Sequence, residues 1–165
     1  MLYYAVMESP IGTILLQSDG VALTALSIRP EQIPDNPEEY TEMPNCTPLP
    51  EAMRQLTAYF NGTLTSFTLP LAPQGTAFQL KVWQKLLEIP FGCCLSYGDL
   101  AMLIGNGNAS RAVGLANSRN PLPIIIPCHR VIGANGDLVG YSGGLDVKKH
   151  LLSHEESIIN PKLPL

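Results

Sequence analysis

A run of three isoleucines, residues 124–126, leads directly into Pro127, Cys128, His129 and Arg130. Such a run has to be buried, so the thiol and imidazole that follow it lie at a fixed place beside the core. We expect the run to be a strand that Pro127 ends, because proline has no N–H to continue a central ladder. A lone cysteine is usually a small core residue, but an ordinary core would reject a titratable and a cationic neighbour. The segment therefore indicates that Cys128 is a nucleophile on a rigid mount.

The composition predicts a globular cytoplasmic protein. The chain has 165 residues, 45% of them hydrophobic, which is enough to bury a core in one domain or two small lobes. No segment approaches the roughly 18 uncharged apolar residues of a membrane span. The first residues lack the basic start of a secretory signal. None of the four cysteines forms a Cys-x-x-Cys pair, so we expect reduced thiols.

Charge is distributed unevenly along the chain. The formal net charge is -4. Residues 1–76 hold two basic and eight acidic side chains, a net charge of -6, whereas residues 77–165 hold eight basic and six acidic ones, a net charge of +2. This division permits a polyanion-binding second lobe in a protein that is acidic overall.

The fold class expected is α+β, with a small antiparallel-sheet lobe over residues 1–75. Short β-rich runs separated by turn residues predict a meander. They cover residues 2–7, 12–17 and 21–28. Residues 29–50 are rich in proline and acidic side chains and predict a loose surface connection, and residues 51–60 predict a helix.

The second lobe, residues 76–165, is expected to be mainly helical. Thr76 and Ser96 each begin a helix-capping pattern, with Gln79 and Asp99 three positions later. Helices are predicted from residue 77 to about 89, 97 to about 104, 109 to about 119 and 146 to about 155. The second and third of these, joined by a glycine turn, fit a helix-turn-helix. Small residues on the third helix leave a face that a large partner can approach, namely Ala112, Gly114, Ala116 and Ser118.

Two further segments precede the last helix. Asn135-Gly136 predicts a hairpin turn. Residues 140–144 are too rich in glycine for a regular element, and Tyr141 and Ser142 within them offer donors of the kind that bind a polar ligand.

Four segments together resemble the O6-methylguanine-DNA methyltransferase family, whose members repair alkylated guanine by direct reversal. The segments are Ile126–Val131, Arg111–Gly114, Tyr141–Gly144 and Leu151–Glu155. The resemblance covers the whole chain and is dense from Gly75 to Glu155. It implies a β-sheet and helix N-terminal lobe and a C-terminal lobe whose helix-turn-helix enters the minor groove of double-stranded DNA. It also implies irreversible transfer of the alkyl group from guanine O6 to Cys128, once per molecule, with O4-alkylthymine as a further candidate substrate. We expect the protein to be a monomer.

The resemblance further implies the roles of the site residues. Glu155 orients His129, which acts through a water molecule as base toward Cys128, and no metal or other cofactor takes part. The residues implied to bind the flipped base are Tyr97, Pro123, Val131, Tyr141, Ser142 and Gly143. The carbonyls of Cys128 and Val131 are implied to accept from the guanine amino group.

The DNA contacts implied by the resemblance lie on the predicted recognition helix. Arg111 fills the place that the flipped nucleotide leaves in the stack. The other members of this set are Ala112, Gly114, Asn117 and Ser118. Asn120 is implied to brace the recognition helix against the active-site strand. Residues 117–119 are more polar than the family pattern, and Cys46 is the only cysteine or histidine before Cys93, so no zinc is expected in the first lobe.

Three other functions remain alternatives. A cysteine hydrolase using Cys128 and His129 is disfavoured, because adjacent residues of a strand point to opposite faces. A non-catalytic sensor of DNA damage on the same fold is disfavoured by the presence of the cysteine itself. A plain helix-turn-helix regulator leaves the Cys-His-Arg segment unexplained.

Overall fold

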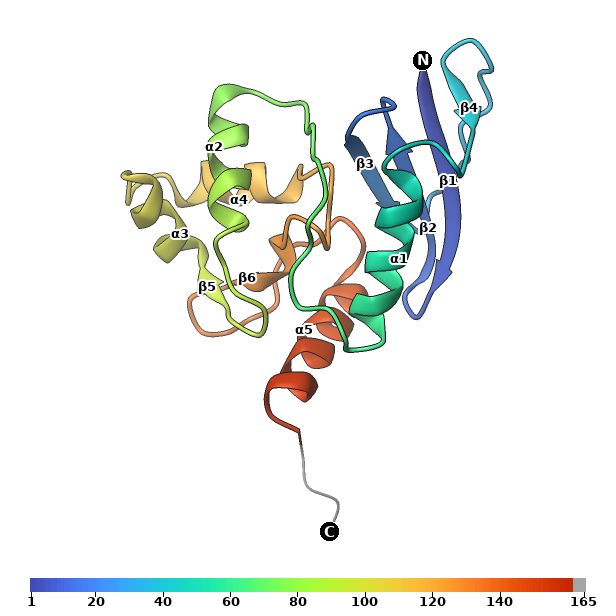
Figure 1. Ribbon diagram of the computed structural model, residues 1–165. Coiled ribbons are helices and arrows are strands. Elements are labelled where there is room, and N and C mark those ends of the chain that lie inside the picture. The colour runs from blue at the N-terminus through green and yellow to red at the C-terminus, as the bar shows by residue number, and fades with distance from the viewer. Residues whose placement is uncertain (162–165) are drawn as a thin grey trace. The chain divides into compact units, whose positions relative to one another are not determined.

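The computed structural model describes residues 1–161 and divides the chain into two compact units, Met1–Gln74 and a second that begins at Gly75. Figure 1 follows both along the chain, and each is described by itself. Within residues 1–161, no helix is both long and apolar enough to cross a membrane.

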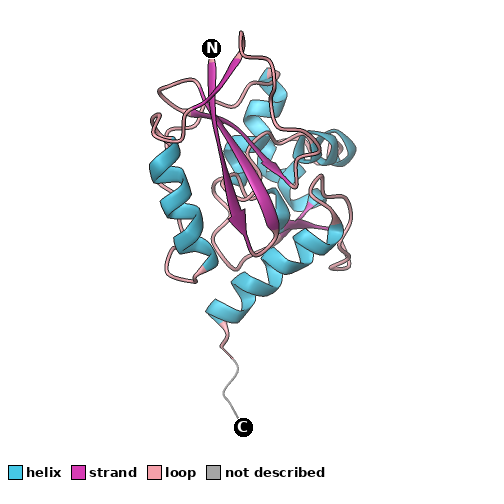
Figure 2. Ribbon diagram, turned by 90° about the vertical axis from the view of Figure 1, so that its right-hand side faces the viewer, coloured by secondary structure: helices cyan, strands magenta, loops and turns pink. Residues whose placement is uncertain are grey.

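The first unit contains a four-stranded sheet in the order β3-β2-β1-β4. The strands β1 (Leu2–Ser9), β2 (Gly12–Ser18) and β3 (Leu23–Ile28) pair antiparallel, which confirms the predicted meander. Figure 2 shows these strands as neighbouring ribbons. Three consecutive residues of β2, Ile14 to Leu16, are buried, as expected of a strand with partners on both sides.

The connection predicted as loose contains a further strand, and here the prediction was wrong. Residues of β4 (Tyr40–Glu42) pair in parallel with β1 at the sheet edge. Three residues are too few to show the alternation by which a strand is recognised in a sequence. The helix α1 (Leu49–Phe60) begins two residues before the expected start and packs on β1 and β2. Its buried face includes Ala52, Leu56 and Tyr59.

Three helices open the second unit, α2 (Ala77–Leu86), α3 (Tyr97–Ile104) and α4 (Ser110–Ser118). Both predicted capping boxes form, since Thr76 caps α2 and Ser96 caps α3. Helix α2 ends earlier than predicted. All three pack on one another, and α3 and α4 form the expected helix-turn-helix pair.

The glycine turn and a buried tryptophan fix this helical cluster. Gly105 ends α3 with a φ of 91°, a left-handed conformation that glycine adopts without strain. The indole N–H of Trp83 donates to the carbonyl of Ala116 at 2.8 Å, so α2 is tied to α4. Ala116 is therefore buried and does not belong to the open face expected from the sequence.

The apolar run before Cys128 is buried but is not a strand, contrary to prediction. Ile124 has a φ of 75°, and the amide of Ile126 donates to the Leu122 carbonyl at 2.8 Å, so the segment is a series of turns. A short 3-10 helix, Cys128–Arg130, follows it. Prolines near both ends of the run remove ladder donors, which explains why no strand forms.

A small two-stranded sheet holds the chain directly after the 3-10 turn. The strands β5 (Leu95–Ser96) and β6 (Val131–Ile132) pair in parallel, so regular structure resumes just after the 3-10 turn. Asn135-Gly136 forms a turn and no hairpin, with the Gly133 amide donating to the Asp137 carbonyl at 2.8 Å. The last helix, α5 (Leu145–Ile159), runs beyond its expected end and packs on the 3-10 turn.

Candidate active site around Cys128

Cys128 is held as a protonated thiol. Its side chain is buried, with 2% of its surface exposed, because the 3-10 turn presents it toward the interior of the second unit. Burial raises the pKa of the thiol to about 11, although the Asn120 side chain and the charge of Lys148 oppose the shift. A nucleophilic reaction at this sulfur therefore needs a base.

The candidate base is His129, and the buried carboxylate of Glu155 lies next to it. The His129 Nε2 and Glu155 Oε2 atoms are 2.6 Å apart, and both side chains are almost completely buried. Arg130 donates to the same carboxylate through Nε at 2.8 Å and Nη2 at 3.2 Å, and the Gly92 amide donates to Oε1 at 3.0 Å. Burial by itself raises the pKa of Glu155, but the hydrogen bonds and charges of His129 and Arg130 outweigh it and lower the pKa well below its ordinary range.

His129 is neutral and its tautomer follows from its partner. Burial lowers the pKa of the imidazole, and Glu155 offsets only part of that effect. Because an ionised carboxylate accepts, Nε2 carries the ring proton and Nδ1 is the free acceptor. The Nδ1 atom is buried and has no hydrogen-bond partner within residues 1–161. The arrangement can thus accept one proton near Cys128.

Lys148, a completely buried lysine on α5, was not predicted from the sequence. Its Nζ donates to the carbonyls of Val131 at 2.6 Å, Val139 at 3.1 Å and Gly140 at 3.4 Å, and burial lowers the pKa of the ammonium group. It therefore ties the segment after the 3-10 turn to the glycine-rich loop. Its position seven residues before Glu155, two helical turns along the same face, is the signal that could have indicated a buried lysine.

The two tyrosines expected to bind the base, Tyr97 and Tyr141, differ in burial and in hydrogen bonding. The Tyr97 side chain is half-buried, its hydroxyl donates to the Val139 carbonyl at 3.0 Å, and burial raises its pKa. The Tyr141 hydroxyl is buried without a hydrogen-bond partner in the described part of the chain. Burial raises the pKa of Tyr141 well above its usual value, and the proximity of Cys128 contributes to the rise.

The other members of the expected base-binding set differ in exposure. Pro123 and Val131 are buried, Gly143 is half-buried and Ser142 is exposed. The carbonyl of Val131 accepts from Lys148, and that of Cys128 accepts from the Val131 amide and from Asn117.

Helix α4 separates the expected DNA contacts into two groups. Arg111, Ala112 and Ser118 are exposed and Gly114 is half-buried, so these side chains lie on an accessible face. Asn117 is only 3% exposed, and its side chain donates to the Cys128 carbonyl, so it does not lie on that accessible face.

Asn120, which follows α4, braces the segment before Cys128. Its Nδ2 donates to the Ile126 carbonyl at 2.7 Å, and its Oδ1 accepts from the Leu122 amide at 3.0 Å. The partner of Asn120 is thus a buried turn where a strand was expected.

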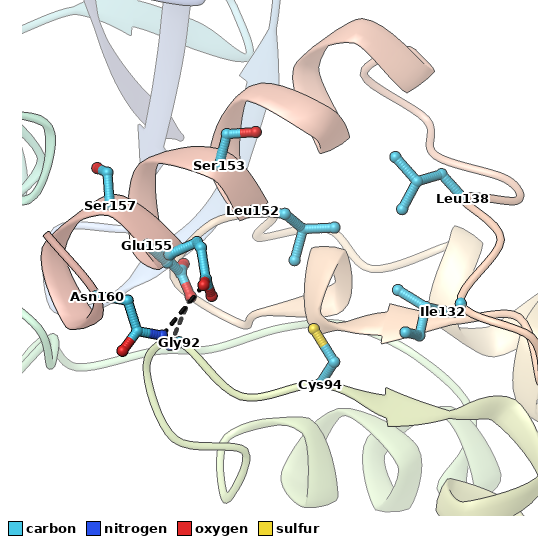
Figure 3. Close-up of a pocket in the computed structure, with 11 residues that line it drawn as sticks. Gly92, Cys94, Ile132, Leu138, Leu152, Ser153, Glu155, Ser157 and Asn160 are labelled. Atoms are coloured by element: carbon cyan, nitrogen blue, oxygen red, sulfur yellow. Dashed lines mark hydrogen bonds between the residues drawn. The ribbon is translucent and has the colours of Figure 1, made fainter. Parts of the chain in front are cut away.

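A cavity of about 680 Å³ lies beside this site. Figure 3 shows Cys94, Ile132, Leu138 and Leu152 around it, and the hydrogen bond from Gly92 to Glu155 at its edge. Cys128 is not among its lining residues. Within residues 1–161, no group of three or more histidine, cysteine or acidic side chains is arranged to hold a metal ion.

Comparison with known proteins identifies the family of the chain. Residues 77–157 match the 6-O-methylguanine DNA methyltransferase DNA-binding domain, and residues 2–73 match the ribonuclease-like domain of the same proteins. A methylated-DNA--protein-cysteine methyltransferase of Methanosarcina acetivorans is 52% identical over 160 residues, covering 94% of this chain and 99% of the relative.

Solved structures agree with that match. An O6-methylguanine methyltransferase of Mycobacterium tuberculosis is similar with a TM-score of 0.88 and 44% identity, covering 98% of this chain and 97% of the other. Mycobacterium tuberculosis OGT in complex with DNA is similar with a TM-score of 0.87 and 47% identity, covering 94% of both chains. The chain belongs to the 6-O-methylguanine DNA methyltransferase family.

Proposed function

We propose that this protein repairs DNA by direct reversal, moving a methyl or other alkyl group from guanine O6 to the sulfur of Cys128. Membership in the family supports the reaction. The observation that carries its assignment to Cys128 is the neighbouring neutral imidazole, whose Nε2 is held by an ionised glutamate while Nδ1 is free to accept a proton.

The proposed step balances without a metal or redox cofactor. The Cys128 thiol gives its proton through a water molecule to His129 Nδ1, the sulfur forms a bond to the alkyl carbon, and the bond between that carbon and O6 breaks. The electron pair stays on the guanine, which is restored once it takes up a proton. The thioether is stable, so each molecule acts once, as a methylated-DNA--protein-cysteine methyltransferase.

The substrate we propose is double-stranded DNA bound at the exposed face of α4, with the second lobe, residues 76–165, carrying both DNA binding and alkyl acceptance. A base inside a duplex is out of reach of a buried thiol, so the nucleotide has to be flipped. Arg111 at the start of α4 is suited to fill the vacated stack, with Ala112, Gly114 and Ser118 beside it. Tyr97, Tyr141 and the 142–143 backbone then hold the base. A cytoplasmic monomer remains part of this proposal.

Intact mass spectrometry tests the reaction. The wild-type protein is incubated with a duplex containing O6-methylguanine, in parallel with the Cys128→Ser variant. We expect the mass of one methyl group to be added to the wild type at Cys128 and to be absent from the variant. DNA binding without any gain of mass would contradict the proposal and favour a non-catalytic damage sensor.

A further inference from the structure

Two asparagines at the end of α4 hold alternate carbonyls of the segment that carries the nucleophile. Asn120 donates to the carbonyl of Ile126 at 2.7 Å, and Asn117, three residues earlier, donates to the carbonyl of Cys128 at 3.3 Å. The backbone N–H of Asn120 also donates to the backbone carbonyl of Asn117 at 3.4 Å, so the two residues belong to the same turn at the end of α4. Asn120 braces the approach, whereas Asn117 contacts the nucleophilic residue itself.

The direction of the Asn117 amide is defined by its acceptor. A flipped amide would place its oxygen against the Cys128 carbonyl oxygen, so the nitrogen has to face Cys128. The Cys128 carbonyl also accepts from the Val131 amide, the bond that closes the 3-10 turn. Asn117 therefore clamps the same peptide group that sets the conformation of the turn.

Asn117 differs from the neighbouring polar residues of α4 in that its side chain is buried. The side chains of Arg111 and Ser118 on the same helix are exposed, whereas Asn117 is 3% exposed. A buried hydrogen bond that spans eleven residues fixes the distance between α4 and the Cys128 turn, because the low local dielectric strengthens it.

We propose that Asn117 is a positioning residue for alkyl transfer, holding the Cys128 turn against α4 so that the sulfur lies in line with the bond that breaks. This inference rests on the proposed function. In-line displacement requires reacting atoms about 3–3.5 Å apart, and a misplacement of about 1 Å costs about a hundredfold in rate. Rotation of the Cys128 peptide group would move the sulfur, since both are attached to the same Cα.

The test compares Asn117→Leu and Asn117→Ala with Asn45→Leu, a matched change at an exposed asparagine in the first unit. Leucine preserves the volume without the donor, and alanine gives a second variant should leucine prevent folding. Three quantities are measured: the rate of transfer from free O6-benzylguanine, the rate of Cys128 alkylation by iodoacetamide, and the affinity for duplex DNA in a Cys128→Ser background.

We expect transfer from O6-benzylguanine to fall about tenfold in the Asn117 variants, as expected for the loss of one buried hydrogen bond. Iodoacetamide has no fixed orientation, so its rate should stay within about twofold of wild type. DNA affinity should be unchanged, and Asn45→Leu should match the wild type in all three measurements.

Distinct results would overturn the inference. An unchanged transfer rate would remove the positioning role. A faster iodoacetamide reaction accompanying slower transfer would mean that the variant merely loosens the fold around a buried thiol. A loss of DNA affinity with normal transfer from the free base would make Asn117 a DNA-binding residue. The failure of the proposed function is a separate result, in which the wild type itself gains no alkyl group at Cys128.

Discussion

Cys128 is the proposed nucleophile, yet its buried thiol resists ionisation. Burial raises its pKa to about 11, so very little thiolate exists near neutral pH before a substrate enters. In the proposed reaction His129 compensates, because burial lowers its pKa and keeps the imidazole unprotonated and able to accept. We therefore expect the reactivity of the sulfur to depend on the neighbouring imidazole and only weakly on the pH of the solution.

The pH dependence of transfer follows from this pairing. Since the His129 pKa lies below its usual 6.5, the rate of transfer from free O6-benzylguanine should be flat between about pH 8 and about pH 6.5 and fall only in more acidic solution. Single-turnover rates measured across this range check it, with Cys128→Ser as the blank. A rate that rises about tenfold per pH unit up to about pH 9 would show that unassisted thiol ionisation limits the reaction.

Residues with local partners could be predicted from the sequence, and residues with distant partners could not. Cys128 was identified from the apolar run before it, and the roles of His129 and Glu155 were inferred from the family resemblance. The contact of Arg130 with Glu155 joins residues 25 positions apart in the sequence, so it could not be predicted. Lys148 was not foreseen because a lysine is expected at the surface unless something pairs with it. Its partners are backbone carbonyls, which no sequence pattern shows.

Among the elements, helices with capping residues were the most predictable. Thr76 and Ser96 cap α2 and α3 through hydrogen bonds to residues three positions later, so the starts of both helices could be predicted. The apolar segment 124–126 misled the prediction because burial alone does not distinguish a strand from turns. Prolines near both ends of the segment remove ladder donors, and the Asn120 side chain, bonded to both Leu122 and Ile126, stabilises the turns.

Arg111 is exposed in the first turn of α4. The effect of replacing it on the rate of alkyl transfer should depend on whether the substrate is duplex DNA or a free base. Arg111→Ala is expected to slow repair of O6-methylguanine in duplex DNA by roughly tenfold to a hundredfold, because flipping costs a few kcal/mol. Transfer from free O6-benzylguanine needs no flipping and should keep its rate. Both rates are measured by following the alkylated protein by mass.

Arg119→Ala is the matched control for this prediction, since Arg119 is also exposed and lies at the other end of α4. It removes an equal charge and should alter salt-dependent affinity more than the rate at saturating DNA. Equal losses on duplex and free base in Arg111→Ala would contradict a role in flipping.

At the scale of the whole molecule, charge is divided unevenly between the two halves of the sequence. The acidic excess lies in residues 1–76, and the slight basic excess lies in residues 77–165, which contain α4. Part of that basic charge is buried, since Arg130 and Lys148 are both inside the second unit. The protein therefore keeps ionisable groups in its interior, and its stability must depend on their protonation.

Acid should destabilise this fold in two pH windows. The folded pKa of His129 lies below its ordinary 6.5, so the unfolded chain binds that proton first and stability falls as the pH drops below 6.5. The folded pKa of Glu155 is also lowered, so its contribution is complete above about pH 4.5 and is lost as the pH falls further. Glu155→Gln leaves Arg130 buried without its carboxylate and should cost roughly 3–5 kcal/mol at neutral pH.

Urea unfolding followed from pH 7 to pH 3 separates these contributions for the wild type, Glu155→Gln and Glu88→Gln. Below about pH 4.5, Glu155→Gln should lose less stability than the wild type does, because the contribution of Glu155 is absent. The fall in stability below pH 6.5 that His129 causes should persist in this variant. Glu88 forms an exposed ion pair with Lys85 at 3.0 Å, so its variant should follow the wild-type curve within about 0.5 kcal/mol. If Glu155→Gln and wild type instead lost stability in parallel below pH 4.5, the pKa of Glu155 would not be lowered in the folded protein. The charge interactions of Glu155 with His129 and Arg130 would then be contradicted, and with them the contact that assigns the His129 tautomer, which makes this curve a test of the reaction as well as of the fold.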